Sequence, residues 1–419
     1  MFNVLNLPAA PSRWYHLVMT HSPNCEIPRE LDRAFDAPTH GGTWGGDRPA
    51  IPSGPKRLAV QPAWVRWTWF LAMIASWTTV SLAGTNSRCQ SASLTEPPSH
   101  RVELSAPRMG TTFTVILYGP QPDDARRAAQ EALDHVETLN AILSDYDPES
   151  ELMAFRGRAG DGAWVELSQP LFECLSRSRE LAERTGGAFD PTAAPVIRLW
   201  RRARRTGERP REDLLRDARE RVDWRALELD PGRRAGRLTR ERVGVDLGGI
   251  AKGYAADAAH RLLVERGYPC CLVAASGDLR LGDPPPGQNG WIVALETLKP
   301  MTTPSAIVAD SAPPPPTLSL SRCGISTSGD AEQFVVIDGV RYSHIIDPRT
   351  GEPLTTRMSV TVIAPDATTS DSWATALAVL GPEKGLALLR PEDRLDVRFA
   401  ILDDQNRLRI TTTPGFGDR

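Results

Sequence analysis

The sequence has 419 residues, a length that allows more than one domain. Its 49 Lys and Arg residues and 52 Asp and Glu residues give a net charge of −3, which offers no reason to expect nucleic acid as a partner. The six cysteines form no CxxC pair and no His/Cys cluster, so the sequence indicates neither a zinc site nor a disulfide framework.

Residues 1–62 differ in composition from the rest of the chain. They are rich in proline, glycine and charged residues and show no sustained hydrophobic periodicity. Such a composition cannot bury enough apolar surface to form a folded core. We therefore expect a disordered region or an over-extended gene start, and the second alternative places the true start downstream of Met1.

A nearly uncharged run, residues 67–83, follows basic residues such as Arg66 and ends in Ser-Leu-Ala. A basic flank, an apolar core and small residues at the end are typical of a secretory signal. Residues 63–84 are therefore predicted to be a signal peptide or, because the run is marginal in length for a membrane span, a retained anchor. The Pro- and Ser-rich linker at 85–100 argues against a buried core helix. We expect an exported protein, periplasmic or anchored to the outer face of the cytoplasmic membrane.

The folded part of the chain is predicted to span residues 101–412. Residues 111–118 predict a strand, and residues 123–143 place apolar side chains at helical spacing, which predicts a long amphipathic helix. The turn-rich segment after this helix presents one aromatic residue, Tyr146. Its ring either stacks on a ligand or covers the core, and composition alone favours neither alternative.

A second helix is predicted from Pro170 to about Thr185, because proline suits the first turn of a helix. The glycine-rich segment 186–192 ends this helix, and it either lines a ligand pocket or caps the helix. Residues 198–225 mix many arginines with acidic residues. This pattern is typical of a solvated helical surface, and attraction of an acidic partner is the alternative.

The stretch 243–259 predicts a strand, a turn at Gly248-Gly249 and a helix, and a further strand is predicted at 271–275. Free N–H groups at a helix start and a close backbone approach at glycines suit an anionic ligand. Asp246 and Lys252 flank the turn, and the helix dipole disfavours a lysine at that end unless an anion such as phosphate is bound beside it. Tight packing alone is the alternative, and the segment matches neither a Walker loop nor a dinucleotide fingerprint.

Three hairpins are predicted, at 226–239, 333–346 and 397–412, together with a proline-rich surface insertion at 299–316. His344 lies near the end of the second hairpin. A histidine at the end of a strand is more often structural than catalytic, but beside a metal and a phosphate it would serve as a base.

A strand at 359–364 precedes a helix that is predicted to open at Asp371. Asp371 and Thr375 are four residues apart and therefore share one face of this helix. Their oxygens are the hard ligands that Mg²⁺ prefers, and this ion also takes backbone carbonyls and substrate phosphates. The alternative is that Asp371 is only the N-cap of the helix.

Seven segments in order resemble the ApbE family, the FAD:protein FMN transferases. They are MGTTFTV (109–115), LSDYDPESEL (143–152), GGAFDPT (186–192), VDLGGIAKGYAAD (245–257), STSGD (326–330), HIIDPRTG (344–351) and SDSWATALAVLG (370–381). The resemblance covers roughly residues 101 to 412 and implies an α+β flavin-transferase fold with a mixed sheet. Two positions depart from the family pattern. Ser276 stands where the family usually has the first glycine of Gly-Gly-Asp, and Trp373 replaces a small aliphatic residue.

The resemblance also implies which residues form the site. The flavin of FAD would lie against Met109, Tyr146, Ala188, Phe189, Asp190, Asp246, Lys252 and Ile346. His344 falls on the position of the catalytic residue. A Mg²⁺ ion on the pyrophosphate would be bound by Asp371, Thr375 and the carbonyl of Gly249, with the carbonyl of Ala374 as a further candidate.

The implied reaction is phosphoryl transfer. A Thr or Ser hydroxyl of a partner protein attacks the FMN-side phosphorus of FAD, AMP leaves, and FMN remains attached to the partner through a phosphoester. The partner would be a flavoprotein subunit of a membrane redox complex. A Mg²⁺-dependent FAD pyrophosphatase and an exported flavin-binding protein without activity are the alternatives. Retention of His344, Asp371 and Thr375 together argues against a flavin-binding protein without activity, because binding alone needs no base.

Overall fold

The computed structural model describes residues 99–296, 298, 315–329, 333–403 and 405–417. The predicted disordered region at 1–62, the predicted signal or anchor at 63–84, and most of the predicted linker and proline-rich insertion lie outside these residues. Among the residues described, no helix is long and apolar enough to cross a membrane.

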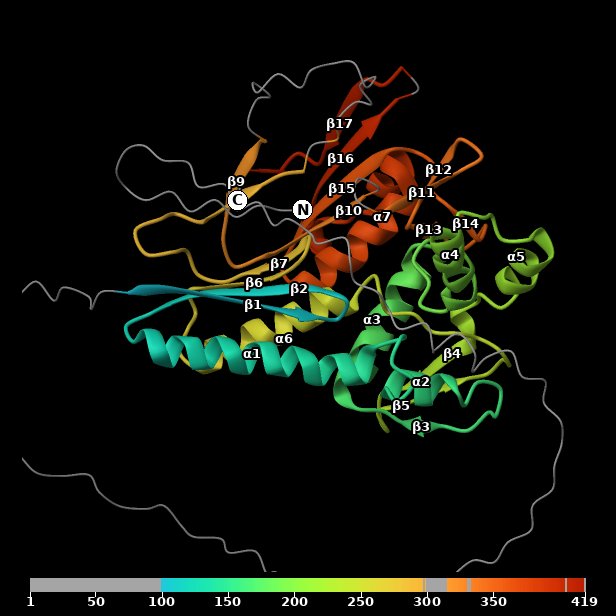
Figure 1. Cartoon of the computed structure of the whole chain (residues 1–419), viewed down its shortest axis with the longest axis horizontal. Coiled ribbons are helices and arrows are strands. Elements are labelled where there is room, and N and C mark those ends of the chain that lie inside the picture. The colour runs from blue at the N-terminus through green and yellow to red at the C-terminus, as the bar shows by residue number, and fades with distance from the viewer. Residues whose placement is uncertain (1–98, 297, 299–314, 330–332, 404, 418–419) are drawn as a thin grey trace, which may run out of the picture. The chain divides into compact units, whose positions relative to one another are not determined.

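Eight strands form the large sheet, in the order β1-β2-β6-β7-β10-β15-β16-β17 (Figure 1). They are β1 (His100–Arg108), β2 (Thr111–Gly119), β6 (Cys271–Ala275), β7 (Asp278–Leu281), β10 (Gly324–Gly329), β15 (Met358–Ala364), β16 (Asp396–Leu402) and β17 (Leu408–Thr412). Every neighbouring pair in this sheet is antiparallel, and a parallel bridge joins Ala193 to Gly244 outside the named strands. The predicted α+β class is confirmed.

The two faces of the large sheet are covered differently. Helices α1 (Pro122–Leu143), α6 (Ala251–Glu265) and α7 (Ala367–Leu388) pack on one face. Strands β8 (Trp291–Ala294) and β9 (Thr317–Leu320) pair and contribute to the apolar cluster on the other. Alternate side chains of a strand point to opposite faces. Accordingly Val115 and Leu117 lie in the helix-side core, whereas Ile116 lies in the cluster with Trp291.

The remaining elements lie at one end of the large sheet (Figure 1). The helices are α2 (Glu151–Arg156), α3 (Gln169–Arg184), α4 (Ala194–Thr206), α5 (Glu212–Arg219), η2 (Trp224–Ala226) and η3 (Pro391–Asp393). A small sheet contains β3 (Val165–Glu166), β5 (Ala235–Leu238) and β4 (Leu227–Asp230), and two further pairs are β11 (Phe334–Ile337) with β12 (Val340–Ser343) and β13 (Ile346–Asp347) with β14 (Glu352–Pro353). Helix α3 contacts both α1 and α7, which joins this end of the molecule to the main core.

The long amphipathic helix, the helix from Pro170 and the three hairpins are confirmed as α1, α3, β4–β5, β11–β12 and β16–β17. In the second hairpin the turn is Asp338-Gly339 as predicted, but the strand that was expected to reach Ile346 ends at Ser343. The chain then bends at His344 and Ile345 and forms β13 with a different partner.

The predicted strand at 243–247 is wrong. Val243, Val245 and Leu247 are apolar at alternate positions, which produces the strand-like pattern, and all five residues of the segment are buried. However, this segment joins no sheet. Its backbone instead contacts the loop after Phe189, where the Asp246 N–H donates to the Pro191 carbonyl at 2.8 Å. It is an extended segment that packs against a loop.

Helix α7 does not open at Asp371. The N-cap is Asp366, whose carboxylate accepts hydrogen bonds from the N–H and the hydroxyl of Thr369, both at 2.8 Å. Asp371 lies in the second turn of α7 and is buried. The N-cap alternative for Asp371 is therefore excluded, and its burial needs another explanation.

A two-residue turn, Ser276-Gly277, joins β6 to β7. Ser276 has φ of +57°, a conformation that costs a residue with a side chain roughly 1–2 kcal/mol relative to the right-handed region. Glycine adopts it without this cost, so the turn geometry explains why a glycine would suit the position. The residue directly after this turn is Asp278.

Candidate functional site

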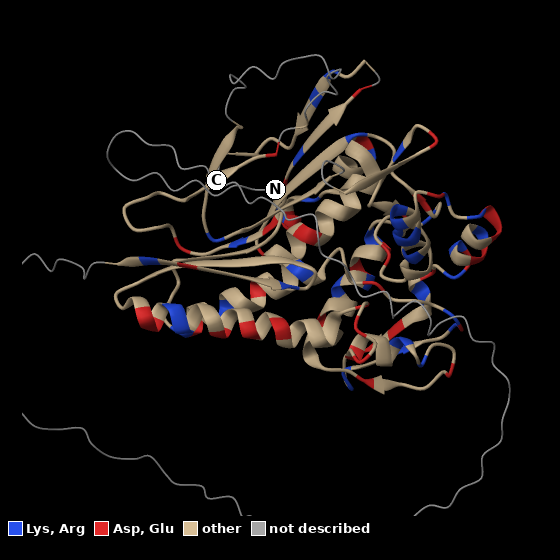
Figure 2. Ribbon diagram, viewed as in Figure 1, with Lys and Arg blue, Asp and Glu red and all other residues tan. Residues whose placement is uncertain are grey.

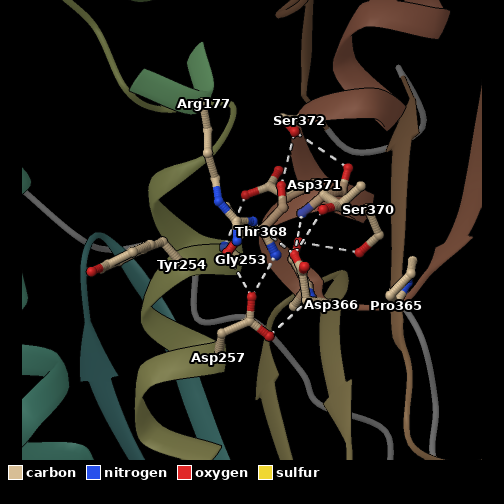
Figure 3. Close-up of polar contacts among 12 residues, drawn as sticks. Arg177, Gly253, Tyr254, Asp257, Pro365, Asp366, Thr368, Ser370, Asp371 and Ser372 are labelled. Carbon is tan, nitrogen blue, oxygen red and sulfur yellow. Dashed lines mark hydrogen bonds and ion pairs between the residues drawn. The ribbon is translucent and has the colours of Figure 1, made fainter. Parts of the chain in front are cut away.

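The first turn of α6 and the second turn of α7 meet at Gly253. The Gly253 N–H donates to Asp371 Oδ2 at 3.0 Å (Figure 3). A Cβ atom on Gly253 would lie 2.2 Å from the Ala367 carbonyl oxygen and 2.8 Å from Asp371 Cβ. A side chain at this position would separate the helices, so glycine is required for the N–H to reach the carboxylate.

Lys252 lies beside this contact and forms ion pairs with two aspartates. Its Nζ is 3.1 Å from Asp278 Oδ2 and 3.5 Å from Asp371 Oδ2, and it donates to the Gly248 carbonyl at 3.3 Å. The interpretation that an anion such as phosphate explains a lysine at this helix start is corrected in one respect. Its countercharges lie within the chain, so its position at a helix start is not by itself evidence of an anion.

Asp278 was not among the predicted site residues. Its side chain is 7% exposed, and Asp278 is the first residue of β7, directly after the Ser276-Gly277 turn that corresponds to the family's Gly-Gly-Asp segment. The sequence did carry a signal for it, because this segment was already recognised as a family motif. Only the folded chain shows that the acid of the motif lies against Lys252.

The charges in this cluster do not cancel. Two carboxylates, Asp278 and Asp371, face one ammonium group, that of Lys252. Burial and the charge of Asp278 raise the pKa of Asp371 to about 7, although Lys252 and the Gly253 N–H oppose this. Burial would lower the pKa of Lys252, but the two aspartates outweigh it and the pKa lies above its ordinary value. The surplus negative charge would be relieved by a bound cation.

The other predicted metal ligands lie next to this cluster. A Cβ atom on Gly249 would be 3.2 Å from Thr375 Oγ1, so the Gly248-Gly249 turn approaches Thr375 closely. Thr375 Oγ1 also lies 3.4 Å from Ser328 Oγ, and Ala374 is buried between Asp371 and Thr375 on α7. Among the described residues there is no group of three or more His, Cys, Asp or Glu side chains that could bind a metal. The oxygens present suit Mg²⁺, which uses one or two carboxylates and completes its shell with substrate phosphates.

A second charged cluster surrounds Arg201. Its guanidinium pairs with Asp246 Oδ2 at 2.8 Å and with Asp145, and lies 4.5 Å from the centre of the Tyr146 ring. The Tyr146 side chain is 67% exposed, so one face of its ring is available for stacking. Burial and the charge of Asp246 raise the pKa of Asp145 to about 6, while Arg201 opposes this shift.

Arg201 was missed by the sequence analysis, which treated residues 198–225 as a solvated surface. Most of that part of the chain is helical, as predicted; the charged residues of α4 are all arginines, whereas α5 carries both signs (Figure 2). However, Trp200 and Ala203 of α4 are buried, and Arg201 turns inward beside them. The apolar residues within the arginine run were the available signal.

The Gly248-Gly249 turn connects the two clusters. Asp246 Oδ1 accepts a hydrogen bond from the Gly248 N–H at 2.8 Å, and the carbonyl of Gly248 accepts one from Lys252. The predicted residues Asp246, Lys252, Gly249, Asp371 and Thr375 are thus brought together.

The loop 186–192 packs against the same turn. Ala188 and Phe189 are buried, and the Phe189 ring lies 3.1 Å from where a Cβ on Gly249 would stand. Asp190 accepts hydrogen bonds from the Thr192 N–H at 2.7 Å, the Thr192 hydroxyl at 2.6 Å and the Trp224 N–H at 3.2 Å. Burial raises its pKa to about 6. Its carboxylate shapes the loop, and its predicted contact with flavin stays a prediction.

His344 lies between β12 and β13. Its backbone N–H donates to the Gln333 carbonyl oxygen at 3.0 Å, and its ring nitrogen Nδ1 lies 3.3 Å from the same oxygen. Burial and the charges of Arg204 and Lys252 lower the pKa of His344 to about 4, although the contact with Gln333 opposes this. The histidine is therefore neutral at pH 7 and lies within range of the charges of both clusters.

The two remaining predicted residues lie at the edges of the core. Ile346 is buried in an apolar cluster that also contains Trp200. Met109 has φ of +49° in the β1–β2 turn and is partly buried against the main core. Their predicted contacts with flavin stay predictions.

Comparison with known proteins identifies the family of the chain. A family model described as the ApbE family matches residues 109–399. The FAD:protein FMN transferase of Treponema pallidum (strain Nichols) is 33% identical over 326 residues, which cover 74% of this chain and 86% of the relative. That of Klebsiella pneumoniae (strain 342) is 31% identical over 346 residues, which cover 80% of this chain and 93% of the relative.

Two solved structures have the same fold. The flavin transferase ApbE from Vibrio cholerae superimposes with a TM-score of 0.67 at 29% sequence identity, covering 76% of this chain and 99% of that chain. The apo form of the Pseudomonas stutzeri flavinyl transferase ApbE gives a TM-score of 0.65 at 28% identity, with coverage of 76% and 96%.

We expect Arg201→Ala to lower the free energy of unfolding by about 3 kcal/mol at pH 8, because removing one partner leaves buried charges without compensation. The loss should be smaller at pH 5. There Asp145, with a pKa of about 6, is protonated and no longer needs the guanidinium. Urea unfolding at the two pH values measures both effects. Arg202→Ala, which changes the exposed neighbour, is the matched control. Equal losses in the two variants, or a loss independent of pH, would contradict the assignment.

Proposed function

The chain belongs to the ApbE family, and we infer from this that it is an FAD:protein FMN transferase. The enzyme transfers FMN from FAD to an acceptor protein. The two relatives named above carry this activity in their names, and the chain aligns with most of the length of each. The observation in the structure that supports it best is the pairing of Lys252 with Asp278 and Asp371 where α6 and α7 meet.

We propose that FAD binds between the two charged clusters. The flavin would stack on the exposed ring of Tyr146, which Arg201 supports from its other side. The pyrophosphate would then lie near Lys252 and the Gly248-Gly249 turn. Arg201 and Arg204 lie within electrostatic range of Tyr146, as do Asp145 and Asp246, and Arg156 and Arg198 act on the same two aspartates. Four arginines therefore face two carboxylates here, and the buried Nη1 of Arg204 has no hydrogen-bond partner among the described residues. A phosphate-containing ligand would compensate this positive charge.

We further propose that Asp371, Thr375 and the carbonyls of Gly249 and Ala374 bind Mg²⁺. When bound, this ion would neutralise charge that develops on the pyrophosphate oxygens. Lys252 supplies a second positive charge from the side of α6. The residues fit the ion because all four ligands are hard oxygens and the cluster carries surplus negative charge.

His344 is proposed to accept the proton of the attacking hydroxyl. If Nδ1 carries its hydrogen toward the Gln333 carbonyl, Nε2 has a free lone pair. The Thr or Ser oxygen forms a bond to the FMN-side phosphorus, the bond from this phosphorus to the AMP phosphate breaks, and the hydroxyl proton passes to Nε2. AMP leaves with the electron pair of the broken bond.

The reaction is tested by incubating the protein with FAD, Mg²⁺ and an acceptor flavoprotein or its Thr/Ser-containing segment, followed by mass spectrometry. We expect the acceptor to gain the mass of FMN less one water, with release of AMP. Free FMN and AMP without modified acceptor would identify a pyrophosphatase. Unchanged FAD would identify a binding protein.

We expect His344→Ala to slow single-turnover transfer by about 10²–10⁴-fold, the usual effect of removing a general base, while FAD affinity changes little. Because the pKa of His344 is lowered to about 4, the base is neutral above that pH. In the wild type, kcat/KM should therefore fall only on acidification toward pH 4 and stay level near 6.5. Flavin fluorescence measures the affinity, and single-turnover assays at several pH values measure the rate. Weak FAD binding with a normal rate at saturation would make His344 a binding residue.

We propose that the enzyme acts outside the cytoplasm, on a flavoprotein subunit of a membrane redox complex. The support is the basic, apolar and small-residue pattern of residues 63–84. N-terminal sequencing of protein from periplasmic and membrane fractions tests this and separates a cleaved signal from a retained anchor. Full-length protein in the cytosolic fraction would contradict it.

A further inference from the structure

A buried carboxylate of α6, that of Asp257, takes up free N–H groups at the start of α7. Asp257 Oδ1 accepts a hydrogen bond from the Ala367 N–H at 2.9 Å. Its Oδ2 accepts bonds from the Thr368 N–H at 2.8 Å and the Thr368 hydroxyl at 2.5 Å (Figure 3). Arg280 Nε lies 3.4 Å from Oδ1 and balances the charge. The proposed reaction gives this carboxylate no role.

Asp366 completes the arrangement from the other side. It caps α7 by accepting a hydrogen bond from the Thr369 N–H at 2.8 Å and pairs with Arg177 of α3 at 3.0 Å. Three consecutive N–H groups, those of residues 367, 368 and 369, therefore donate to carboxylates. These groups have no partner within a helix, and here they attach the start of α7 to two other helices. Both the position and the rotation of its first turn are thereby determined.

Asp371 lies one turn beyond this attachment. Gly253 and Asp257 are four residues apart and so lie on one face of α6. The Gly253 N–H donates to the Asp371 carboxylate at 3.0 Å, and the Asp257 carboxylate accepts from the Ala367 N–H, one turn earlier in α7. A single face of α6 therefore determines both where the backbone of Asp371 runs and where its carboxylate points. Thr375 follows Asp371 by one further turn, so any rotation of the start of α7 would displace both residues together.

We propose that Asp257 is a positioning residue that holds Asp371 and Thr375 in the geometry that binds magnesium, without touching the ion or FAD. This rests on the magnesium site of the proposed function. Residues that orient metal ligands typically contribute 10–100-fold to metal affinity. A carboxylate that merely stabilised the helix would instead affect unfolding and leave metal affinity unchanged in the folded protein.

The test compares Asp257→Asn with the wild-type full-length protein, below the unfolding temperature of both. The amide has the shape of the carboxylate but only one accepting oxygen and no charge, so it cannot accept from both N–H groups. Mn²⁺ is the probe, with free ion measured by electron paramagnetic resonance and Mg²⁺ added as competitor. We expect affinity for both ions to fall about 10–100-fold, and the transfer rate to recover at high Mg²⁺. FAD affinity without metal should stay unchanged.

Asp393→Asn is the matched control. Asp393 accepts a hydrogen bond from the Arg390 N–H at 2.8 Å and pairs with Arg184 at 2.7 Å, so it makes the same kinds of contact at η3, beyond the end of α7. We expect it to lower the unfolding temperature but to leave Mn²⁺ affinity unchanged. Thr368→Val removes one donor to Asp257 while keeping the carboxylate. It should weaken Mn²⁺ binding in the same direction by a smaller factor, and it replaces Asp257→Asn should that variant fail to fold.

Asp371→Asn separates this proposal from the one on which it rests. Wild-type Mn²⁺ affinity in Asp371→Asn would overturn the magnesium site itself. Loss of binding in Asp371→Asn, together with unchanged affinity in Asp257→Asn and Thr368→Val, would leave the site in place and overturn the positioning role. Equal loss of affinity in Asp257→Asn and Asp393→Asn would also overturn it, because the effect would then be one of general stability.

Discussion

The contact between α6 and α7 at Gly253 is the constraint on which the site depends. Burying the Asp371 carboxylate is costly unless it is paired and hydrogen-bonded, and here the Gly253 N–H and the Lys252 ammonium perform these functions. Both donors belong to the first turn of α6. This explains a lysine at a helix end where the dipole opposes it, since two buried aspartates supply a stronger favourable field. It also explains the glycine, whose Cβ would displace the Ala367 carbonyl.

Elements with strong local periodicity could be predicted from the sequence. Helices α1 and α3 and the hairpin β11–β12 follow from apolar spacing and turn residues within a few positions of one another. Strand β10 was not predicted, because Ile325 is its only large apolar residue and the others are glycines, serines and a threonine. Ser326 pairs with Ser370 of α7 at 2.8 Å, and Thr327 with Thr361 of β15 at 2.9 Å. The hydroxyl groups of this strand find their hydrogen-bond partners 44 and 34 residues away, and a local sequence pattern does not contain this information.

The same limit applies to the site. Asp246, Lys252, Asp371 and Thr375 were predicted from local spacing and the other members from the family resemblance. Asp278 and Arg201 became evident as site residues only from the folded chain. Many arginines lie between residues 198 and 225, and they look alike in the sequence. Arg201 differs from the others because it pairs with Asp145 and Asp246, which lie 56 and 45 residues from it in the sequence. The pattern at 243–247 misled for a related reason, since alternating apolar residues occur equally in a sheet strand and in an extended segment that packs against a loop.

The two clusters differ in the sign of their surplus charge, and this difference bears on how the site would work. The cluster at Lys252 has one more carboxylate than ammonium groups. Around Arg201, by contrast, the four arginines Arg156, Arg198, Arg201 and Arg204 face the two carboxylates of Asp145 and Asp246, and the charge of Arg204 reaches His344. The Gly248-Gly249 turn joins them through Asp246 and Lys252, so they cannot move independently. A phosphate-containing ligand would balance the positive charge of the arginines, and a divalent cation beside it would balance the negative charge of the aspartates at Lys252. Either component alone would leave the charge of one cluster unbalanced. We therefore expect FAD and the cation to bind with positive coupling, each raising the affinity for the other.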